Sequence, residues 1–324
     1  MKLLVTGATG KVGQTFIRRF LTERSGGVIR ALCHNRVLEE SDRLEVVRGS
    51  ISDRENVARA LDGVTHVLHL ATCKETPDDV MDVTVKGLFW LLEECRVSPT
   101  FEQFILIGGD AAIGHFVYPH PIPVTEQKPF SPYKGCYALS KVLEEAMLEQ
   151  YYIQYDLNGC CLRAPWIMEK DDFKYSLSFG EDVFGGPRWC DLVGKEQAKS
   201  YAEAETIPVM LDADSEPVLR NFVHVEDLVT AILAALDHPK ARQELFHICM
   251  DEPVDYRKVA EYLKASRGLD SVDIRTEFHS TWLDNTKAKF LLNWRPEYDL
   301  KRLVDEAWDY VREDDDQRRV YYPG

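Results

Sequence analysis

The chain opens with an apolar run that leads directly into three glycines and then into an amphipathic segment. The glycines follow the spacing Gly-x-x-Gly-x-x-Gly. In a strand, turn and helix unit, the first glycine allows the tight turn, the second lets a pyrophosphate approach the backbone, and the third lets the helix pack on the strand. The positive end of the helix favours the phosphates. The predicted cofactor contacts of this dinucleotide-binding loop are Gly7, Thr9, Gly10, Lys11, Val12 and Gly13.

Beyond this unit, apolar runs alternate with helical patterns. The predicted strands are residues 28–33, 44–48, 64–70, 104–107 and 159–163, and the predicted helices are near residues 11–24, 53–62, 78–96 and 132–155. This repetition needs crossover connections, so it predicts a parallel sheet with helices on both faces. The predicted fold class is therefore α/β, a Rossmann-type doubly wound parallel sheet, with ligands at the carboxyl ends of the strands.

The pattern also predicts how the chain divides. The predicted Rossmann domain is residues 1–165, with residues 220–250 returning to it, and the smaller C-terminal substrate-binding region is residues 166–219 and 251–324. In the second region the helical and strand patterns loosen, and irregular loops beside a rigid scaffold often carry recognition. Its aromatic residues could wall the substrate or form a local hydrophobic cluster; they are Phe173, Tyr175, Phe179 and Trp189.

Composition excludes several classes of protein. The chain has 324 residues, 45% of them hydrophobic, and no apolar stretch as long as a membrane span. Its first residues belong to the predicted first strand, so we expect no signal peptide and a cytoplasmic location. The eight cysteines show no metal-ligand spacing, which favours reduced thiols and no metal site. The net charge of −15 argues against a nucleic-acid partner.

Tyr137 and Lys141 stand four residues apart at the start of a predicted helix. This spacing places the phenol and the ammonium on one face of the helix, roughly 6 Å apart along its axis. A phenol with a pKa of about 10 is a poor base at neutral pH, but a neighbouring cation and an oxidised nicotinamide stabilise the phenolate. Tyr137 can then take a proton from a hydroxyl while hydride leaves the same carbon. We therefore predict Tyr137 and Lys141 as the catalytic residues.

Together with the glycine loop, this pair resembles the short-chain dehydrogenase/reductase superfamily, in its extended branch, the NAD-dependent epimerase/dehydratase family. The resemblance covers nearly the whole chain and is carried by the glycine loop and by residues 62–71, 132–141, 162–163, 220–227 and 287–296. It implies an NAD(P)-dependent oxidoreductase or epimerase that acts on a hydroxyl or carbonyl of a sugar-like or other small substrate, with Tyr137 as acid/base. Lys141 would also bond the nicotinamide ribose. The other cofactor positions that it implies are Ser50, Ile51, Leu70, Ala71, Thr72 and Ile107.

The departures from the family pattern bear on the reaction and the substrate. Gly109 stands where relatives carry a Ser or Thr whose hydroxyl bonds the substrate oxygen, so Asp110, a water or a substrate group would take over that bond. Losing one such donor can cost about two to three orders of magnitude in rate. The Asn that commonly helps to hold nucleotide sugars is replaced within the segment Ala164-Pro165-Trp166. A smaller sugar or sugar acid therefore fits better, with Trp166 as a flat apolar wall.

The second predicted strand indicates which dinucleotide is used. Its last residue is Cys33, where NAD-selective sites carry an acidic residue that accepts bonds from the ribose. The next residues are His34, Asn35 and Arg36, and Arg36 could pair with a 2′-phosphate. We include these three among the cofactor positions and favour NADP over NAD, with a solvated loop arginine as the alternative.

Further residues have two interpretations each. Arg220 matches the family position that meets a substrate phosphate or carboxylate, or it forms a salt bridge with Glu226 or Asp227. Structural roles are favoured for four histidines, His115, His120, His224 and His247. Relatives commonly dimerise through the Tyr–Lys helix and its neighbour, so a homodimer is expected, although core packing also explains the apolar residues of that seam: Leu88, Leu91, Leu92, Val142, Leu143 and Met147.

A second hypothesis on function remains. The chain could keep the fold and the cofactor site but act as a dinucleotide-binding regulatory module with weak or no catalysis, which Gly109 would permit. The retained Tyr137 and Lys141 argue against this alternative. Cofactor reduction in a screen of sugars, sugar acids and small carbonyls separates the two.

Overall fold

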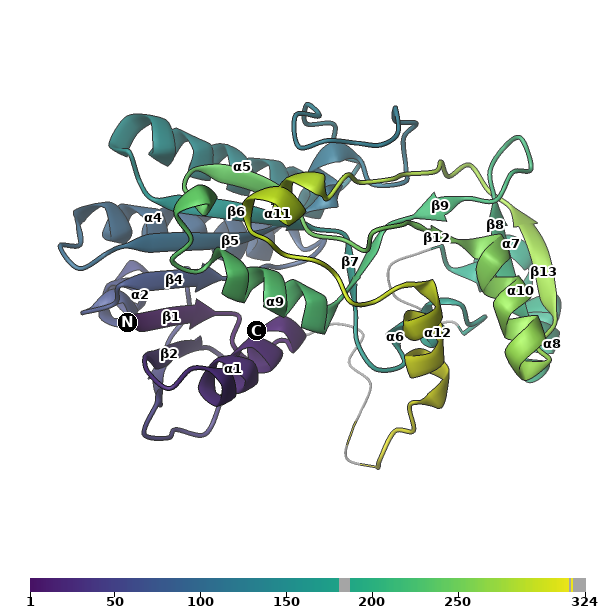
Figure 1. Cartoon of the computed structure of the whole chain (residues 1–324), viewed down its shortest axis with the longest axis horizontal. Coiled ribbons are helices and arrows are strands. Elements are labelled where there is room, and N and C mark those ends of the chain that lie inside the picture. Colours follow the sequence, from purple (N-terminus) through teal and green to yellow (C-terminus); the bar gives the residue numbers. More distant parts are fainter. Residues whose placement is uncertain (181–186, 315, 317–324) are drawn as a thin grey trace.

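The computed structural model describes residues 1–180, 187–314 and 316. The strands of its central sheet are β1 (Lys2–Thr6), β2 (Val28–Cys33), β3 (Leu44–Arg48), β4 (His66–His69), β5 (Gln103–Gly109), β6 (Gly159–Ala164) and β11 (Glu244–His247). They lie in the order β11-β6-β5-β4-β1-β2-β3, and each neighbouring pair is parallel (Figure 1). The predicted Rossmann-type doubly wound sheet is confirmed.

Helices cover the two faces of this sheet. The helices that pack on it are α1 (Lys11–Glu23) and α9 (Val225–Ala235) on one face, and α2 (Arg54–Leu61), α4 (Gly87–Val97) and α5 (Cys136–Tyr155) on the other. Neighbouring residues of a strand point to opposite faces, so Leu3 and Val5 join the first core and Leu4 joins the second. Because both faces are buried, the strands read as continuous apolar runs in the sequence.

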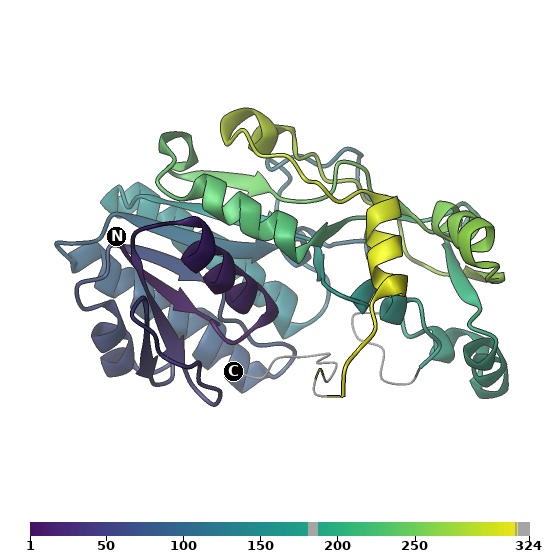
Figure 2. The ribbon, with the colours of Figure 1, turned by 60° about the horizontal axis from the view of Figure 1, so that its bottom comes forward.

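The strand order also fixes where a ligand can bind. After β3 the chain crosses back over the sheet and places β4 on the other side of β1. The loops that follow β1 and β4 therefore leave the sheet in different directions and open a crevice at their carboxyl ends. In Figures 1 and 2 the smaller part of the molecule lies beyond this end of the sheet.

Two helix boundaries have local causes, and a third predicted helix is divided. Asp53 caps α2, because its Oδ1 accepts hydrogen bonds from the backbone N–H groups of Glu55 (2.9 Å) and Asn56 (3.4 Å). The helix predicted from residue 132 begins only at Cys136, because Gly135 has φ +141° and ψ 154°. The helix predicted at residues 78–96 is divided into α3 (Pro77–Asp79), a π-type segment η1 (Val80–Lys86) and α4.

The smaller part has its own core and three two-stranded sheets. Its elements are β7 (Trp166–Met168), α6 (Asp172–Ser176), α7 (Trp189–Val193), α8 (Lys195–Glu203), β8 (Ile207–Leu211), β9 (Leu219–Arg220), β10 (Phe222–His224), β12 (Val254–Asp255), α10 (Tyr256–Arg267), β13 (Ser271–Arg275) and α12 (Leu300–Asp309). Phe173, Phe179 and Trp189 are buried in this core, which matches the hydrophobic-cluster interpretation for these three.

Later segments of the chain rejoin the first core. Helix α9 packs on α1, and β11 adds the last strand to the central sheet beside β6. The short helix α11 (Thr286–Leu291) and Trp294 pack on the same core. Two short 3₁₀ helices are η2 (Asp110–Ile113) and η3 (Pro239–Ala241). The domain boundaries stay a prediction, and within the second region residues 181–186, 315 and 317–324 lie outside the described residues.

Two features of composition can be followed in the structure. All eight cysteines lie among the described residues, and each is a free thiol. None of the described helices combines the length and the apolar character that crossing a bilayer would need.

Candidate active site

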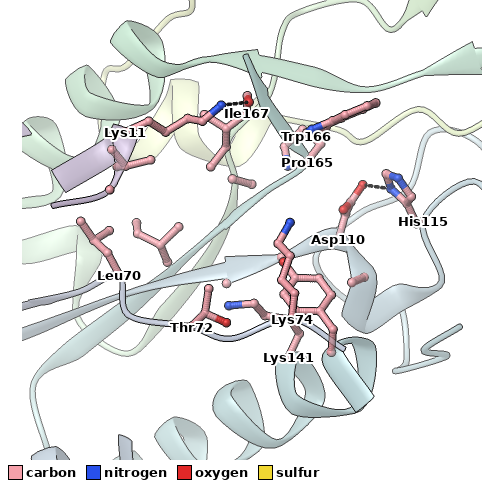
Figure 3. A pocket seen from close by; sticks show the side chains of 18 of the residues that line it. Lys11, Leu70, Thr72, Lys74, Asp110, His115, Lys141, Pro165, Trp166 and Ile167 are labelled. Atoms are coloured by element: carbon pink, nitrogen blue, oxygen red, sulfur yellow. Dashed lines mark hydrogen bonds and ion pairs between the residues drawn. The ribbon is translucent and has the colours of Figure 1, made fainter. Parts of the chain in front are cut away.

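A cavity of about 820 Å³ opens at the carboxyl ends of the central strands (Figure 3). The predicted site residues that line it are Gly7, Thr9, Gly10, Lys11, Val12, Gly13, Arg36, Leu70, Ala71, Thr72, Ile107, Gly109, Asp110, Tyr137, Lys141, Trp166 and Arg220. Four predicted cofactor residues do not line it: His34, Asn35, Ser50 and Ile51. The glycine loop and the Tyr–Lys pair therefore share one cavity, although about 130 residues separate them in the sequence.

The glycine loop is packed too tightly for larger residues at two of its three positions. Gly7 has φ +65°, and a Cβ on it would lie 2.8 Å from the carbonyl carbon of Leu70. A Cβ on Gly13 would lie 2.5 Å from the carbonyl oxygen of Gly7 and 2.7 Å from the Cα of Ala8. Gly10 donates its N–H to the carbonyl oxygen of Gly7 at 3.0 Å, which closes the turn before α1. The first turn of α1 is thereby held against the end of β1.

Replacing Gly13 with alanine is expected to weaken dinucleotide binding by about fivefold to 150-fold. The added methyl group has to push the loop away from α1, and overpacking of this kind costs about 1–3 kcal/mol, where about 1.4 kcal/mol is tenfold in affinity. Calorimetric titration with NAD and NADP measures the change. Gly26→Ala is the matched control, because a Cβ there meets nothing within 4 Å. Unchanged affinity in the Gly13 variant would mean that the loop does not hold the cofactor.

Lys11 joins the glycine loop to the smaller part of the molecule. Its Nζ donates a hydrogen bond to the carbonyl oxygen of Ile167 at 3.3 Å, as Figure 3 shows. The same Nζ lies 2.5 Å from Oδ2 of Asp172. Asp172 is the first residue of α6 and also lines the cavity. The sequence offered no signal for Asp172, because its partner stands 161 positions away.

The end of β2 brings only one of its predicted residues to the cavity. Arg36 lines it, whereas His34 and Asn35 are exposed. After β3, Ile51 is buried in the core, where a Cβ on Gly87 would lie 2.9 Å from its Cγ2. Ser50 Oγ lies 2.8 Å from Ser52 Oγ. Arg36 is thus the residue of this edge best placed to meet a ribose or its 2′-phosphate.

The ring of Tyr137 lies near two ammonium groups. Lys141 Nζ is 5.7 Å and Lys74 Nζ is 5.1 Å from the ring centroid. Burial raises the pKa of Tyr137 above its ordinary value, and Lys141 acts in the opposite direction. Lys141 therefore stabilises a phenolate that burial disfavours, and a further positive charge, such as an oxidised nicotinamide, would add to this effect.

The sequence did not single out Lys74, which lies in the loop after β4. Burial, followed by the charges of Lys141 and Lys11, lowers its pKa to about 8. Three lysines from three loops or helices thus gather at the cavity, although the protein as a whole is acidic. Such a cluster suits a ligand with negative charges.

Gly109, where the family resemblance leads us to expect a hydroxyl, has room for a larger side chain. Its backbone is extended, with φ −144° and ψ 146°, and the atoms nearest to a Cβ on it would be side-chain carbons of Lys141 at 3.5–3.7 Å. A serine would fit there without backbone strain. The neighbouring Gly108 differs, because a Cβ on it would lie 2.7 Å from Cys161 Sγ. Glycine is therefore a steric need at position 108 but not at position 109.

Asp110, His115 and Arg220 form a chain of contacts at the cavity. His115 Nδ1 lies 2.5 Å from Asp110 Oδ2 (Figure 3), and its Nε2 lies 2.9 Å from Nη2 of Arg220. Burial lowers the pKa of His115, with Asp110 opposing, so the ring is neutral. It then donates from Nδ1 to Asp110 and accepts from Arg220 at Nε2. His115, for which the sequence favoured a structural role, thus lies at the site.

Arg220 is held between aromatic rings. Its side chain is 2% exposed, and its guanidinium carbon lies 4.0 Å from the ring centroid of Phe116 and 4.5 Å from that of Trp166. The carboxylates proposed as its alternative partners are engaged elsewhere. Glu226 pairs with Arg18 and Arg19. Asp227 accepts the backbone N–H groups of two residues, Glu297 and Tyr298.

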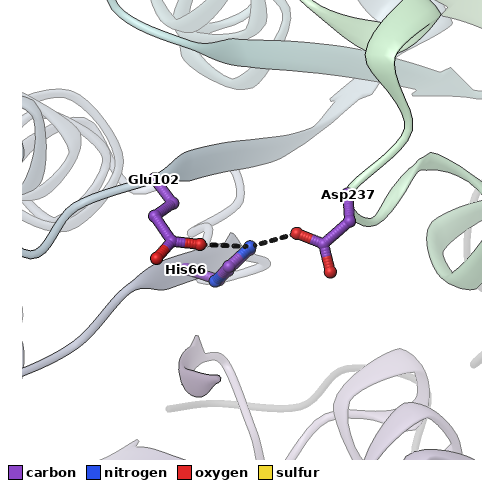
Figure 4. A group of neighbouring side chains, drawn as sticks. All are labelled: His66, Glu102 and Asp237. Atoms are coloured by element: carbon purple, nitrogen blue, oxygen red, sulfur yellow. Dashed lines mark hydrogen bonds and ion pairs between the residues drawn. The ribbon is translucent and has the colours of Figure 1, made fainter.

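A second group of polar side chains lies at the opposite, amino-terminal edge of the sheet. His66 Nε2 lies 2.7 Å from Asp237 Oδ1 and 3.8 Å from Glu102 Oε2 (Figure 4). It also joins the start of β4 to the turn after α9. Both carboxylates are more than half exposed, so the group belongs to the surface rather than to the cavity.

Comparisons with known proteins agree with this arrangement. The model of the NAD dependent epimerase/dehydratase family matches residues 3–168. The chain is 26% identical to UDP-glucose 4-epimerase of Mycolicibacterium smegmatis, over 96% of this chain and 99% of that protein. It is 24% identical to UDP-glucuronate 4-epimerase 4 of Arabidopsis thaliana, over 92% of this chain and 72% of that protein.

Solved structures show the same fold. A short-chain dehydrogenase/reductase superfamily protein of Agrobacterium tumefaciens with bound NAD superposes with a TM-score of 0.78 at 24% identity, covering 95% of this chain and 96% of its own. UDP-glucuronic acid 4-epimerase of Bacillus cereus, in complex with UDP-glucuronic acid and NAD, gives a TM-score of 0.73 at 19% identity, covering 96% and 98%. Because the family model spans half of the chain, with the glycine loop inside it, this protein is an enzyme of the NAD dependent epimerase/dehydratase family.

Proposed function

We propose that the protein is an NAD(P)-dependent oxidoreductase or epimerase that acts on a hydroxyl or carbonyl group of a small sugar-like substrate, with Tyr137 as acid/base. One observation carries the proposal: Tyr137 and Lys141 line the same cavity as the glycine loop. A dinucleotide held by the loop and a substrate beside the phenol would then share one space. The family of the chain supports a nicotinamide cofactor.

The reaction follows from the positions of these side chains. In the oxidative direction Tyr137 Oη, as phenolate, accepts the proton of the substrate hydroxyl. When bound, the oxidised nicotinamide supplies the hydride acceptor. With the cofactor bound, Lys141 would keep a positive charge beside the phenolate and would also bond the nicotinamide ribose. A carbonyl compound reduced again on its opposite face would give an epimer, whereas its release would give net oxidation.

The cofactor residues are proposed from the cavity. The glycine loop would hold the pyrophosphate at the start of α1, and Ile107 and the three residues after β4 would line the nicotinamide half; those three are Leu70, Ala71 and Thr72. The four predicted residues outside the cavity lack this support.

The choice of dinucleotide is tested at Arg36. The named solved structures contain NAD, whereas Arg36 at the cavity favours the 2′-phosphate of NADP. We expect Arg36→Ala to weaken NADP binding about tenfold and to leave NAD binding nearly unchanged, because a charge-assisted bond of about 1.5–3 kcal/mol is lost only with NADP. Calorimetry with both dinucleotides measures this difference. Equal losses for the two would show that Arg36 does not contact the 2′ position.

The substrate is proposed to be a sugar acid or another small sugar derivative. A single cavity of about 820 Å³ has to hold the dinucleotide as well as the substrate, which leaves limited room. Trp166 offers a flat wall, and Arg220 a buried cation that suits a carboxylate. Asp110 is placed to accept a hydrogen bond from a substrate hydroxyl near Gly109.

A cofactor-reduction screen tests this function. Neutral sugars, sugar acids and UDP-sugars are each supplied with NAD and with NADP, and both cofactor absorbance and epimerised product are followed. We expect turnover with sugar acids. Turnover restricted to UDP-glucose or UDP-glucuronate, on which the named relatives act, would overturn the small-substrate proposal but keep the reaction class.

The second candidate function is a dinucleotide-binding regulatory module. The observation that favours it is Gly109, which leaves the substrate oxygen without the usual hydroxyl. Such a module would bind a dinucleotide tightly and show no turnover in the same screen. The Tyr137–Lys141 pair in the cavity favours the enzyme.

We also propose a homodimer through α4 and α5, in the cytoplasm. Leu88, Leu91 and Leu92 are fully buried within the protomer and cannot form the seam. The outer surfaces of the two helices instead carry Phe89, 39% exposed, and Leu139, 49% exposed. Light scattering at micromolar concentration tests this assembly, and a monomeric mass would overturn it.

A further inference from the structure

The carboxylate of Glu144 is buried next to the catalytic lysine and has no role in the reaction described above. Glu144 and Lys141 are 1% and 4% exposed, and Glu144 Oε2 lies 2.8 Å from Lys141 Nζ. The two residues stand three apart on α5 and so share one face of the helix. Lys141 thus has a full counter-ion inside the protein, directly beside the residue that carries the acid/base function.

The opposite side of Glu144 is closed by His69. Burial, and then the charge of Lys141, lowers the pKa of His69 to about 3, so its ring is neutral. Thr6 Oγ1 accepts the backbone N–H groups of Leu70 (3.1 Å) and Ala71 (3.2 Å), so its own proton is donated to His69 Nδ1 at 2.8 Å.

The remaining ring proton of His69 is therefore on Nε2. This atom lies 4.0 Å from Glu144 Oε1, a distance at which the N–H dipole acts on the carboxylate without a hydrogen bond. The central sheet, through His69, and the helix, through Lys141, thus both direct positive charge at Glu144. Burial raises the pKa of Glu144, and Lys141 opposes this rise. The pair is built to hold a charged carboxylate.

We propose that Glu144 is a positioning residue of the reaction: its buried carboxylate is the counter-ion that keeps the Lys141 ammonium charged and fixed beside Tyr137, and it thereby sets the pH range in which the pair works. This inference rests on the proposed acid/base role of Tyr137.

The charge of Glu144 raises the pKa of both Lys141 and Tyr137. Burial lowers the pKa of Lys141, but Glu144 and Tyr137 together raise it above its ordinary value. Among the charges near Tyr137, Glu144 disfavours the phenolate and so raises its pKa. The reaction needs Tyr137 deprotonated and Lys141 protonated. Removing the negative charge of Glu144 lowers the pKa of Tyr137 and the pKa of Lys141, so the whole bell-shaped pH profile moves to lower pH.

Other ionisable groups also face the three residues and stay in place in such a variant. They are Lys74 and Glu75 after β4, Asp110 after β5, Glu145 on α5, Cys161 on β6, His69 on β4 and Tyr133 before α5. Any change in the profile of a Glu144 variant is therefore measured against a constant background.

The first test is the pH dependence of kcat/KM for Glu144→Gln, which keeps the shape of the side chain and removes its charge. We expect both limbs to move down by at least about one pH unit, a tenfold change in each ionisation constant. Glu149→Gln is the control, because Glu149 is an exposed carboxylate of the same helix. Its profile should coincide with that of the wild type. Coincident profiles for Glu144→Gln and the wild type would overturn the proposal.

A second measurement needs neither substrate nor turnover. Reductive methylation modifies only the neutral form of a lysine, so the extent of labelling of Lys141, read by peptide mass spectrometry across a pH series, reports its ionisation. We expect Lys141 to become reactive at lower pH in Glu144→Gln than in the wild type and in Glu149→Gln. If Glu144→Gln does not fold, Glu144→Asp, whose shorter side chain moves the carboxylate away from Lys141, should give a smaller shift in the same direction.

These two measurements separate the inference from the function on which it rests. Unchanged labelling of Lys141 in the Glu144 variant overturns the counter-ion role, whatever the enzyme does. Full activity in Tyr137→Phe would instead overturn the acid/base role and leave the labelling result to decide the charge of Lys141.

Discussion

Replacing Tyr137 with phenylalanine is expected to lower kcat by about 10²–10⁴-fold, the range that a positioned general acid or base contributes. The substitution removes only Oη, so the ring keeps its contacts with the ammonium groups of Lys74 and Lys141. Dinucleotide affinity is therefore expected to stay close to that of the wild type. Initial rates with the substrate found in the screen, combined with calorimetry for the cofactor, measure the two quantities separately.

Tyr152→Phe is the matched control for this experiment. Tyr152 belongs to the same helix, does not line the cavity, and its buried hydroxyl makes no hydrogen bond within the described part of the chain. Its removal should leave kcat unchanged. If Tyr137→Phe and Tyr152→Phe both kept the wild-type rate, Tyr137 would not be the acid/base of this enzyme.

Most of the fold could be predicted, because its signals are local. A strand buried on both faces, such as β5, reads as a continuous apolar run, and its expected range, residues 104–107, differs from the observed one by two residues or fewer at each end. The helix after β4 was predicted as one unit, yet a π-type turn occupies Val80–Lys86. There Thr84 Oγ1 accepts the backbone N–H of Cys73 at 2.9 Å, a tertiary contact that periodicity does not reveal.

The residues of the candidate site likewise fall into those with a local sequence signal and those placed by tertiary contacts. The glycine loop and the Tyr137–Lys141 pair are each contained within one element, so their spacing alone pointed to them. Asp172 and His115 lie at the cavity because of contacts with distant segments of the chain, so no local sequence pattern indicates their place at the site. Ile51, expected at the cofactor from its family position, is buried in the core, where it packs against Gly87 of α4.

Consecutive glutamates on α5 have different surroundings. Glu144 faces Lys141 and His69, whereas Glu145 faces Arg163 of β6. Arg163 is 1% exposed and donates to both carboxylate oxygens of Glu145, at 3.0 Å from Nε and 2.5 Å from Nη2. Its Nη1 lies 2.9 Å from Nε2 of His247 on β11. This fork, the Arg163 guanidinium with its contacts to Glu145 and His247, connects α5, which carries the predicted catalytic pair, to β6 and β11.

Replacing Arg163 with alanine is expected to lower the free energy of unfolding by about 3–5 kcal/mol, because it leaves the Glu145 carboxylate buried without its counter-ion. Denaturant unfolding measures the loss. Arg54→Ala, which breaks the exposed ion pair with Glu94, should cost about 1 kcal/mol or less. The double variant Glu145→Ala with Arg163→Ala should lose less than the sum of its single variants, because it no longer buries an unpaired charge. Strict additivity would show that water reaches Glu145 once the arginine is gone, and that the fork does not fix α5 on the sheet.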